Sequence, residues 1–332
     1  MKAAMTPLLS VSNLQTHFET PHGVVQAVND VSFQLKKGEI LGIVGESGSG
    51  KSVMAQSLMR VVPETNLCKT SGKINFNGID LMNLTPNQMR EIRGASISMV
   101  TQNPSTSLNP VFTVEDQLLE TLKFHPQDQI KNPRERMLQL MTEVQLPNPE
   151  LVAKRYPFQL SGGMKQRIAI AMALMCEPEL LIADEPTTAL DVTIQAQLLE
   201  LIKSIRNTHG TSIILITHDL GVVAQLCDTV GVMYAGQLVE YNTVEEIFQN
   251  PRHPYTKALL DSNPVFGKKQ SSLKAMKGQP PQLSKLGAGC SFADRCEQAL
   301  PLCHQTQTDL IRLGEFYHHR CSVSTLTGVA NL

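Results

Sequence analysis

The chain of 332 residues lacks three features that would place it in a familiar class at once. Its longest uninterrupted apolar run, Ile168–Cys176, is about half of the roughly twenty residues that a membrane-spanning helix needs. It has no excess of charge, because 29 Lys and Arg against 30 Asp and Glu leave a net charge of −1. This balance argues against a nucleic-acid binder that relies on bulk positive charge. The start of the chain carries one charge and an early proline, so we expect no signal peptide.

Short repeats and low-complexity tracts are also missing, and 42% hydrophobic with 18% charged residues excludes a wholly disordered chain. The seven cysteines are an odd number, as expected in a reducing compartment. Cys68, Cys176 and Cys227 are scattered and are expected in the core. Four more cysteines lie close together near the end of the chain.

β-rich runs alternate with helical stretches as far as Tyr255, which favours a parallel sheet covered by helices. We expect a nucleotide-binding domain over residues 1–255, with a helical subdomain inserted at about 104–162. Residues 256–332 would form a small C-terminal extension. The expected strands are 31–35, 40–44, 95–101, 180–183 and 213–217, and the expected helices include 53–60, 113–122 and 134–144.

The strongest motif is Gly-Glu-Ser-Gly-Ser-Gly-Lys-Ser at residues 45–52, which fits the G-x-x-x-x-G-K-[ST] phosphate loop at every position. An apolar run precedes it and a helical stretch follows, which is the context this loop requires. Its glycines let backbone N–H groups converge on a phosphate chain, at the positive end of a helix. Its lysine would reach the outer phosphates, and its last serine would hold Mg²⁺. The expected nucleotide contacts are Gly45, Ser47, Gly48, Gly50, Lys51 and Ser52.

Two adjacent carboxylates end a second apolar run, Leu180–Ala183. Alone, such a pair is often a solvated turn, but together with a phosphate loop it fits a Walker B element. Asp184 would then bind Mg²⁺ directly or through water. Glu185 would act as the general base that polarises the attacking water.

A third motif, Leu-Ser-Gly-Gly-Met-Lys-Gln-Arg at residues 160–167, stands where a helix begins. Ser161 has an ordinary explanation as a helix N-cap. Ser-Gly-Gly at a helix N-terminus is also a second anion site, so Ser161, Gly162 and Gly163 are candidate phosphate contacts. Two phosphate sites in one chain suggest a nucleotide shared between two chains.

These motifs resemble those of ABC transporter ATP-binding subunits. Residues 160–167 resemble the signature motif of that family, and residues 184–191 resemble Walker B continuing into the D-loop. Gln102 resembles the Q-loop glutamine, and His218 resembles the switch histidine. The resemblance implies an α/β P-loop NTPase of ABC type, with N-terminal antiparallel β strands, a parallel-sheet core, an inserted helical subdomain and a small cysteine-rich extension.

The resemblance also implies an ATPase that uses ATP and Mg²⁺ in a head-to-tail pair of nucleotide-binding domains. Glu185 and His218 would be catalytic, and Asp191 would lie at the dimer seam. Phe18 is the candidate for stacking on adenine. Ser161 and Gly163 would contact the nucleotide of the partner domain. The implied Mg²⁺ ligands are Ser52, Gln102 and Asp184.

Four further segments resemble the ATPase subunits of oligopeptide and dipeptide importers. They are residues 102–110, His-Pro-Tyr-Thr at 253–256, Gly-Gln-Pro-Pro at 278–281, and residues 289–296. The resemblance implies a peripheral motor at the cytoplasmic face of the cell membrane. Its implied partners are a second, related but different ATPase, two transmembrane permeases and an extracytoplasmic substrate-binding protein.

Two residues leave the substrate open, because Asn103 and Ala288 depart from the pattern of this subfamily. Nickel, glutathione and antimicrobial peptides are alternative cargoes within it. A soluble ABC ATPase acting on nucleic acid or ribosomes is the alternative from another class. The net charge of −1 and the single cassette give that alternative no support.

The late cysteines, Cys290, Cys296, Cys303 and Cys321, have the spacing C-x5-C-x6-C-x17-C. Disulfides are disfavoured in a cytosolic ATPase. A Cys₄ zinc site is a second possibility, although the intervals between these cysteines are wider than the usual C-x2-4-C pairs of zinc ligands. A [4Fe–4S] cluster needs four thiolates and tolerates varied loops, and the resemblance implies such a cluster in some members. Four free thiols in a mobile tail remain the ordinary alternative.

Overall fold

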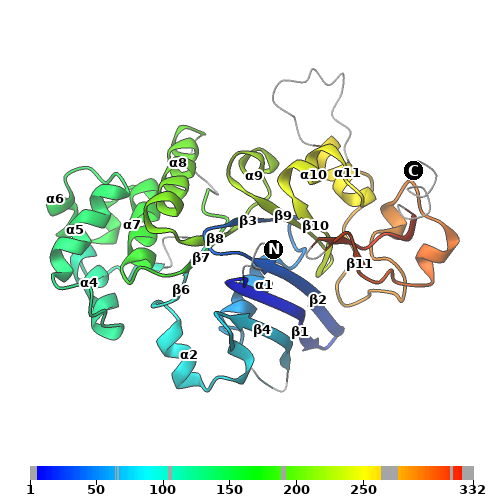
Figure 1. Ribbon diagram of the computed structural model, residues 1–332, viewed down its shortest axis with the longest axis horizontal. Coiled ribbons are helices and arrows are strands. Elements are labelled where there is room, and N and C mark those ends of the chain that lie inside the picture. The colour runs from blue at the N-terminus through cyan, green and yellow to red at the C-terminus, as the bar shows by residue number, and fades with distance from the viewer. Residues whose placement is uncertain are drawn as a thin grey trace, which may run out of the picture. The chain divides into compact units, whose positions relative to one another are not determined.

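The computed structural model describes residues 6–63, 65, 67–103, 107–187, 192–262, 276–314 and 317–323. The chain divides into two compact units (Figure 1). The first consists of Met1–Lys36, Leu41–Asn83 and Thr217–Leu332, and the second of Lys37–Ile40 and Leu84–Ile216. Among the described residues, no helix is both long enough and apolar enough to cross a bilayer.

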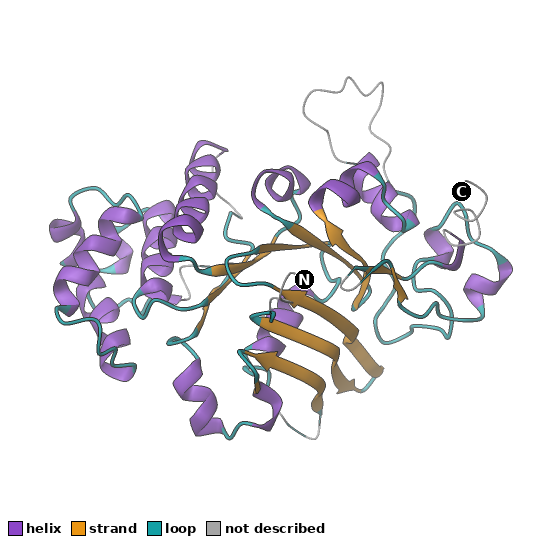
Figure 2. Ribbon diagram, viewed as in Figure 1, coloured by secondary structure: helices purple, strands orange, loops and turns teal. Residues whose placement is uncertain are grey.

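An antiparallel sheet opens the first unit, with the strand order β2-β1-β4-β5. Alternate residues of β1 are buried, as expected of a strand with one face on a core. The structure therefore confirms the predicted N-terminal antiparallel strands (Figure 2). The strands are β1 (Leu9–Thr20), β2 (Gly23–Leu35), β4 (Cys68–Phe76) and β5 (Ile79–Asp80), followed by the short helix η1 (Leu81–Asn83).

A second set of strands in the first unit has the order β11-β12-β10-β9-β3. β3 (Ile40–Val44) is buried along its whole length and runs parallel to β9 (Thr229–Tyr234). The next pairs are antiparallel, so this part of the core sheet is mixed. The small C-terminal extension contributes two short strands to it. The antiparallel strands are β10 (Gln237–Thr243), β11 (Ile311–Arg312) and β12 (His318–His319).

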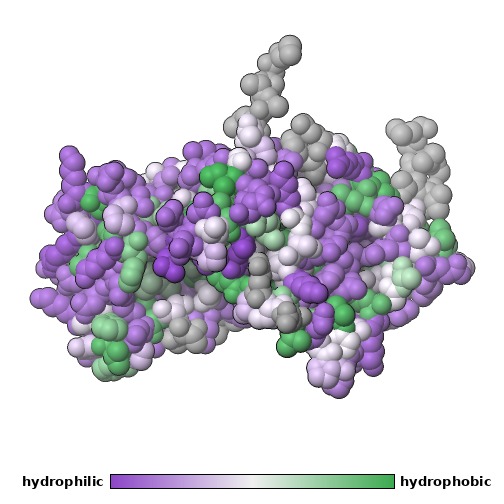
Figure 3. All heavy atoms as spheres, turned by 90° about the horizontal axis from the view of Figure 1, so that it is seen from below, coloured by the Kyte–Doolittle hydropathy of each residue, from purple (hydrophilic) through white to green (hydrophobic). Residues whose placement is uncertain are grey.

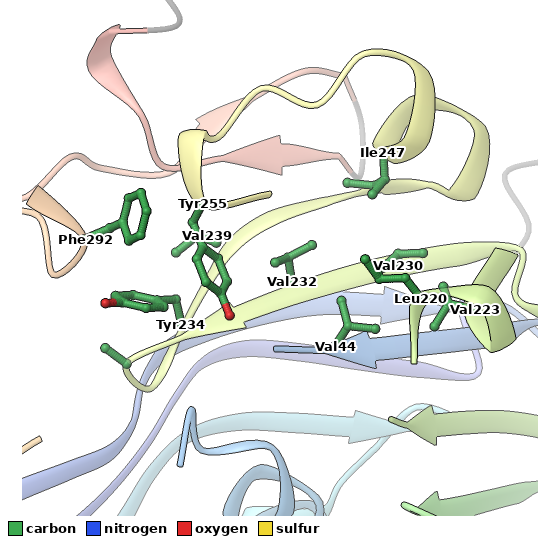
Figure 4. Close-up of a cluster of buried hydrophobic side chains, with 11 residues drawn as sticks. Val44, Leu220, Val223, Val230, Val232, Tyr234, Val239, Ile247, Tyr255 and Phe292 are labelled. Atoms are coloured by element: carbon green, nitrogen blue, oxygen red, sulfur yellow. The ribbon is translucent and has the colours of Figure 1, made fainter. Parts of the chain in front are cut away.

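Helices of the first unit cover an apolar cluster that includes Val44, Val232 and Tyr234 from the strands (Figure 4). Phe292, from the C-terminal extension, is buried in the same cluster. The extension is thus part of the core of this unit. The helices that contribute to this cluster are α9 (Leu220–Leu226), α10 (Val244–Gln249) and α11 (Pro254–Asp261). The unit also contains α1 (Lys51–Leu58), η3 (Ala293–Arg295) and η4 (Pro301–His304).

The second unit has three parallel strands in the order β8-β7-β6 and a group of helices, drawn in purple in Figure 2. Thr113 and Asp116 form a capping box at the start of α4, which explains why that helix begins there. The elements are α2 (Pro86–Ile92), β6 (Ile97–Val100), α4 (Val114–Phe124), α5 (Pro133–Glu143), α6 (Pro149–Ala153), η2 (Pro157–Gln159), α7 (Gly162–Leu174), β7 (Leu180–Asp184), α8 (Val192–His209) and β8 (Ser212–Ile216).

Candidate nucleotide site

The phosphate loop, residues 45–52, has a backbone shape that requires glycine at two positions. Gly45 and Gly50 have φ angles of 154° and 101°. A Cβ atom at Gly45 would lie 2.1 Å from the carbonyl oxygen of Met233, and one at Gly50 would lie 2.1 Å from that of Ala27. The loop is therefore held closely against β9 and β2, in a conformation that a residue with a side chain could not adopt without strain.

Lys51 places a positive charge inside this loop. The residue is 5% exposed, and its Nζ donates to the carbonyl oxygens of Gly45 at 2.9 Å and Glu46 at 3.0 Å. α1 begins at Lys51, with Gly50 at the N-cap and no side chain capping the helix. An uncapped helix N-terminus beside a buried ammonium group suits a chain of phosphates.

The structure locates four further predicted nucleotide contacts of the first unit. Ser47 and Gly48 are exposed at the tip of the loop, and Ser52 is half-buried in the first turn of α1. Phe18 is half-buried in β1, two residues after Thr16, whose hydroxyl contacts α1. Because side chains alternate along a strand, Phe18 lies on the face of β1 that carries Thr16.

The structure brings together Gln102 and Glu185, two residues that the sequence analysis assigned to one nucleotide site. The amide Nε2 of Gln102 donates to Oε2 of Glu185 at 2.9 Å. Asp184 is 4% exposed at the end of β7, while Glu185 is half-buried just beyond it. Glu185 has a φ of 45°, and its backbone N–H donates to the carbonyl of Ile216 in β8. The turn after β7 is thus fixed so that this carboxylate meets the Q-loop amide.

The predicted signature motif forms an exposed helix N-terminus. Ser161 is the N-cap of α7, and its Oγ accepts the N–H of Met164 at 3.3 Å. Gly162 is exposed, with no atom within 4 Å of a Cβ built on it, and Gly163 is half-buried. The ordinary N-cap explanation of Ser161 is therefore correct, and the same geometry leaves the surface of Gly162 open, whereas a Cβ on Gly163 would lie 3.4 Å from Ile194.

Arg167 anchors α7 inside the second unit. Its Nη1 donates to the carbonyl oxygen of Val144 at 2.7 Å, and its Nη2 donates to Oε1 of Gln197 at 2.8 Å. Its side chain is buried, and this burial lowers the pKa of its guanidinium below the ordinary value. These bonds fix α7, the helix that begins in the predicted signature motif, to α5 and α8.

His218 follows β8 and is exposed. The next residue, Asp219, caps α9 by accepting the N–H groups of Gly221 and Val222. This cap holds the backbone just after the histidine in a defined turn. Asp191 lies outside the described residues.

Sequence reasoning missed two residues that hold the phosphate loop from outside. Arg295 binds the carboxylate of Glu46 through Nη1 at 2.7 Å and Nη2 at 2.9 Å. The phenolic oxygen of Tyr255 accepts the backbone N–H of Glu46 at 2.9 Å. The hydrogen bond to Glu46 raises the pKa of Arg295 above its ordinary value. The motifs that contain them, His-Pro-Tyr-Thr and the segment around the second late cysteine, were the available signals.

None of the four late cysteines, all of them within the described residues, forms a disulfide. The pKa of Cys290 is raised to about 11, mainly by burial and to a smaller extent by the neighbouring Cys303, Cys321 and Cys296. The backbone N–H of Cys290 donates to the carbonyl of Cys303 at 2.7 Å. Across the described part of the chain, however, no group of three or more His, Cys, Asp or Glu side chains is arranged to hold a metal ion. The four thiols are neighbours without forming a metal site.

Comparison with known proteins decides the family. The ABC transporter family model matches residues 28–188, and the model described as "Oligopeptide/dipeptide transporter, C-terminal region" matches residues 239–303. The dipeptide transport ATP-binding protein DppD of Bacillus subtilis is 52% identical over 299 residues, covering 90% of this chain and 89% of the relative. The chain belongs to the ABC transporter ATP-binding family.

Two further relatives of this ABC protein carry related names. The oligopeptide transport ATP-binding protein AppD of Bacillus subtilis is 47% identical over 92% of this chain and 94% of its own length. The oligopeptide transport ATP-binding protein OppD of Haemophilus influenzae is 46% identical over 90% of this chain and 92% of its own.

Solved structures agree with the ABC fold. The dimeric bacterial ABC transporter cassette MJ0796 has a TM-score of 0.63 and 27% identity, covering 71% of this chain and 98% of the cassette. A dimeric post-hydrolysis state of the same cassette, bound to ADP and Pi, has a TM-score of 0.63 and 26% identity, with the same coverage. The predicted fold class is confirmed, and as a member of the ABC family the chain binds and hydrolyses ATP.

Proposed function

We propose that this chain is the ATP-hydrolysing motor subunit of a bacterial importer for dipeptides and oligopeptides. The observation that carries the proposal is the joint presence of an ABC cassette and an oligopeptide/dipeptide transporter C-terminal region, in a chain 52% identical to a dipeptide transport protein. The motor would act at the cytoplasmic face of the cell membrane, with two permeases, a substrate-binding protein and a second, related ATPase. The proposed division is an ABC domain over 1–255, with its helical subdomain at 104–162, and an extension over 256–332.

The test is uptake by cells that lack this chain. Loss of di- and oligopeptide uptake, restored by the wild-type gene but not by a Glu185→Gln variant, is the expected result. Nickel and glutathione uptake should be unchanged. Loss of nickel uptake with normal peptide uptake would contradict the proposal, as would purification of the chain with ribosomal RNA instead of permeases.

The proposed nucleotide chemistry assigns one role to each predicted residue. Lys51 and the loop N–H groups bind the phosphates, and Ser52 with Asp184 and Gln102 supplies ligands for Mg²⁺. Glu185 takes the proton of the attacking water, and its contact with Gln102 supports this role because the amide orients the carboxylate.

The remaining roles concern the partner domain and the base of the nucleotide. His218 holds the γ-phosphate, Phe18 stacks on adenine and Asp191 lies at the dimer seam. Ser161, Gly162 and Gly163 serve the nucleotide bound by the partner. Ser161→Arg should therefore stop transport while ATP still binds to the isolated chain, and loss of that binding would show that Ser161 serves its own site.

A groove of about 570 Å³ in the second unit is the proposed docking site of a short permease helix. Phe112 and Phe124 line it and are 49% and 73% exposed. In Figure 3 the end of the surface where Figure 1 labels α4 to α6 is mostly hydrophilic, with a small hydrophobic group near its lower edge. Exposed aromatic side chains beside a groove are typical of a surface that binds an apolar partner.

The same groove is connected to the Q-loop. The amide of Gln117 donates to the carbonyl oxygens of Asn109 and Phe112 at 3.0 Å, and its Oε1 accepts the N–H of Asn109. The hydroxyl of Thr101, the residue before Gln102, lies 2.9 Å from the hydroxyl of Ser107, which lines the groove. A movement of Gln102 would therefore shift residues that line the groove.

The docking proposal is tested in the assembled transporter. Phe124→Asp should uncouple the complex, with lower transport and less permease recovered with the ATPase. Leu151→Asp is the matched control, because Leu151 is 61% exposed in the same unit and does not line the groove. Equal losses in both variants would contradict the proposal.

The four late cysteines are proposed to hold a [4Fe–4S] cluster. Support comes from the donor set: four reduced thiols that are electrostatic neighbours, which is the number and chemistry such a cluster needs. The cluster would order the extension, because metal binding is linked to local folding. Anaerobically purified protein should contain roughly four irons per chain, and Cys303→Ser should remove them.

The control is Cys68→Ser, which changes a buried cysteine of β4 and should leave the iron in place. Stoichiometric zinc without iron would favour a Cys₄ zinc site. Freely alkylated thiols with neither metal would leave the mobile-tail alternative.

A further inference from the structure

Glu46, the second residue of the phosphate loop, is bound on two sides by residues that lie more than two hundred positions later. Arg295 forms a two-point ion pair with its carboxylate, at 2.7 and 2.9 Å. Tyr255 accepts its backbone N–H at 2.9 Å. The side chain of Arg295 is 6% exposed and that of Glu46 is 27% exposed, so water screens this pair only partly.

The guanidinium group of Arg295 is also held by residues other than Glu46. Its Nε donates to the carbonyl oxygen of Lys277 at 3.0 Å, and its Nη1 also donates to the hydroxyl of Tyr234 at 3.2 Å. Its Cζ lies 5.7 Å from the ring centroid of Tyr234 and 5.9 Å from that of Phe292. The guanidinium group is therefore already ordered when it meets Glu46, which lowers the entropic cost of the ion pair.

Tyr255 is held as firmly. Its backbone N–H donates to Nδ1 of His253 at 3.0 Å, and its ring centroid lies 4.5 Å from that of Tyr234 and 5.4 Å from that of Phe292. Figure 4 shows the three rings gathered at one end of the apolar cluster. These contacts explain the His-Pro-Tyr part of the sequence. The histidine caps α11, and the hydroxyl of the tyrosine binds the phosphate loop.

We propose that Tyr255 and Arg295 are positioning residues for nucleotide binding, which set the phosphate loop through Glu46 and so make ATP affinity depend on the C-terminal extension. The proposal rests on the nucleotide site proposed above. Two effects act together. A loop with three glycines at positive φ samples fewer conformations when one residue is held, and a preorganised site binds more tightly. Arg295 also neutralises a carboxylate that would otherwise repel a phosphate chain.

The two effects predict unequal losses. Arg295→Gln leaves Glu46 charged and unpaired beside the phosphates, so the dissociation constant for Mg-ATP should rise about tenfold. Glu46→Gln removes the repulsion together with the ion pair, and the rise should be about threefold. The double variant should resemble Glu46→Gln, which means that the second change rescues the first. Tyr255→Phe keeps the ring and removes one hydrogen bond, so about a twofold rise is expected.

Salt separates this electrostatic role from a merely structural one. Raising ionic strength from about 0.05 to 0.5 M should shrink the loss in Arg295→Gln, because repulsion between Glu46 and the phosphates is screened. Loss caused by general loosening of the extension would not shrink. Arg295→Lys, which keeps the charge without the two-point geometry, should fall between the wild type and Arg295→Gln.

The chain supplies a matched control in Arg320. Like Arg295 it directly precedes one of the late cysteines, and it pairs with Asp30 at 2.6 Å. The exposed fractions of the two side chains, 7% and 32%, are close to those of the Arg295–Glu46 pair. Asp30 is not part of the phosphate loop, so Arg320→Gln should lower stability without changing ATP affinity.

The experiment is a titration of the full-length chain with a fluorescent ATP analogue and Mg²⁺, alongside thermal unfolding of each variant. Rescue of Arg295→Gln by Glu46→Gln, with Arg320→Gln unchanged, supports the proposal. Affinity within twofold of wild type in Arg295→Gln overturns it, and so does an equal loss in Arg320→Gln. Lys51→Ala distinguishes failure of this proposal from failure of the proposed nucleotide site. If Lys51→Ala binds the ATP analogue as tightly as wild type, the assignment of the nucleotide site itself is wrong.

Discussion

Gly50→Ala should destabilise the phosphate loop strongly, even in the absence of nucleotide. The added methyl carbon would lie 2.1 Å from the carbonyl oxygen of Ala27, about an ångström closer than real contacts allow. Since the neighbouring atom is backbone, either β2 or the start of α1 must move. Forced overpacking of this kind costs about 1–3 kcal/mol.

The positive φ angle adds a second cost. Gly50 has a φ of 101°, where a residue with a Cβ pays about 1–2 kcal/mol. The sum is about 2–5 kcal/mol of lost stability. Gly48→Ala is the matched comparison, because its φ of 78° carries the same kind of cost while no atom lies within 4 Å of the new Cβ. It should lose about 1–2 kcal/mol.

Urea unfolding of the nucleotide-free chain measures both effects. The two variants should show different midpoints with similar slopes, and Gly50→Ala should unfold first. Equal midpoints would refute the argument that β2 confines the loop. A Gly50→Ala variant as stable as wild type would refute the loop geometry itself.

Three further predictions can be tested on the same protein. Glu185→Gln keeps an acceptor for the amide of Gln102 but lacks the base, so single-turnover hydrolysis should slow by about 10²–10⁴-fold while ATP still binds; an unchanged rate would exclude Glu185 as the base. Burial lowers the pKa of His253 to about 3, whereas the unfolded chain takes up this proton near the ordinary value of about 6.5. The free energy of unfolding should therefore fall as the pH drops below about 6.5. His253→Asn should make the urea midpoint depend less on pH over this range. Arg167→Met leaves the carbonyl of Val144 without its buried donor and should cost about 1–3 kcal/mol by the same assay, whereas a loss near zero would mean that α7 does not depend on this anchor.

Local patterns predicted the core elements because each carries its signal in consecutive residues. The all-apolar run that predicted a strand over residues 40–44 is β3, with the same bounds. The helix expected at residues 113–122 is α4, Val114–Phe124, with Thr113 as its cap. The contact between Gln102 and Glu185 was also predictable, because both sit just after strands that lie side by side in one parallel sheet.

Contacts that depend on long separations could not be predicted in this way. Glu46 and Arg295 are 249 positions apart, and neither residue type is unusual at its place. The two-residue strands β11 and β12 are too short for any periodicity to show. Sequence distance was therefore a poor guide to the extension, which looked remote from the phosphate loop and in fact touches it.

The Arg295–Glu46 contact has a reciprocal side. If the extension tightens ATP binding by some factor, thermodynamic linkage requires that bound ATP tighten the extension by the same factor. Arg295 ends the short helix η3, which Cys290 precedes and Cys296 follows. Bound nucleotide would thus hold the segment from Cys290 to Cys296 more tightly, so that each turnover of the motor would alternately tighten and loosen the surroundings of two proposed cluster ligands.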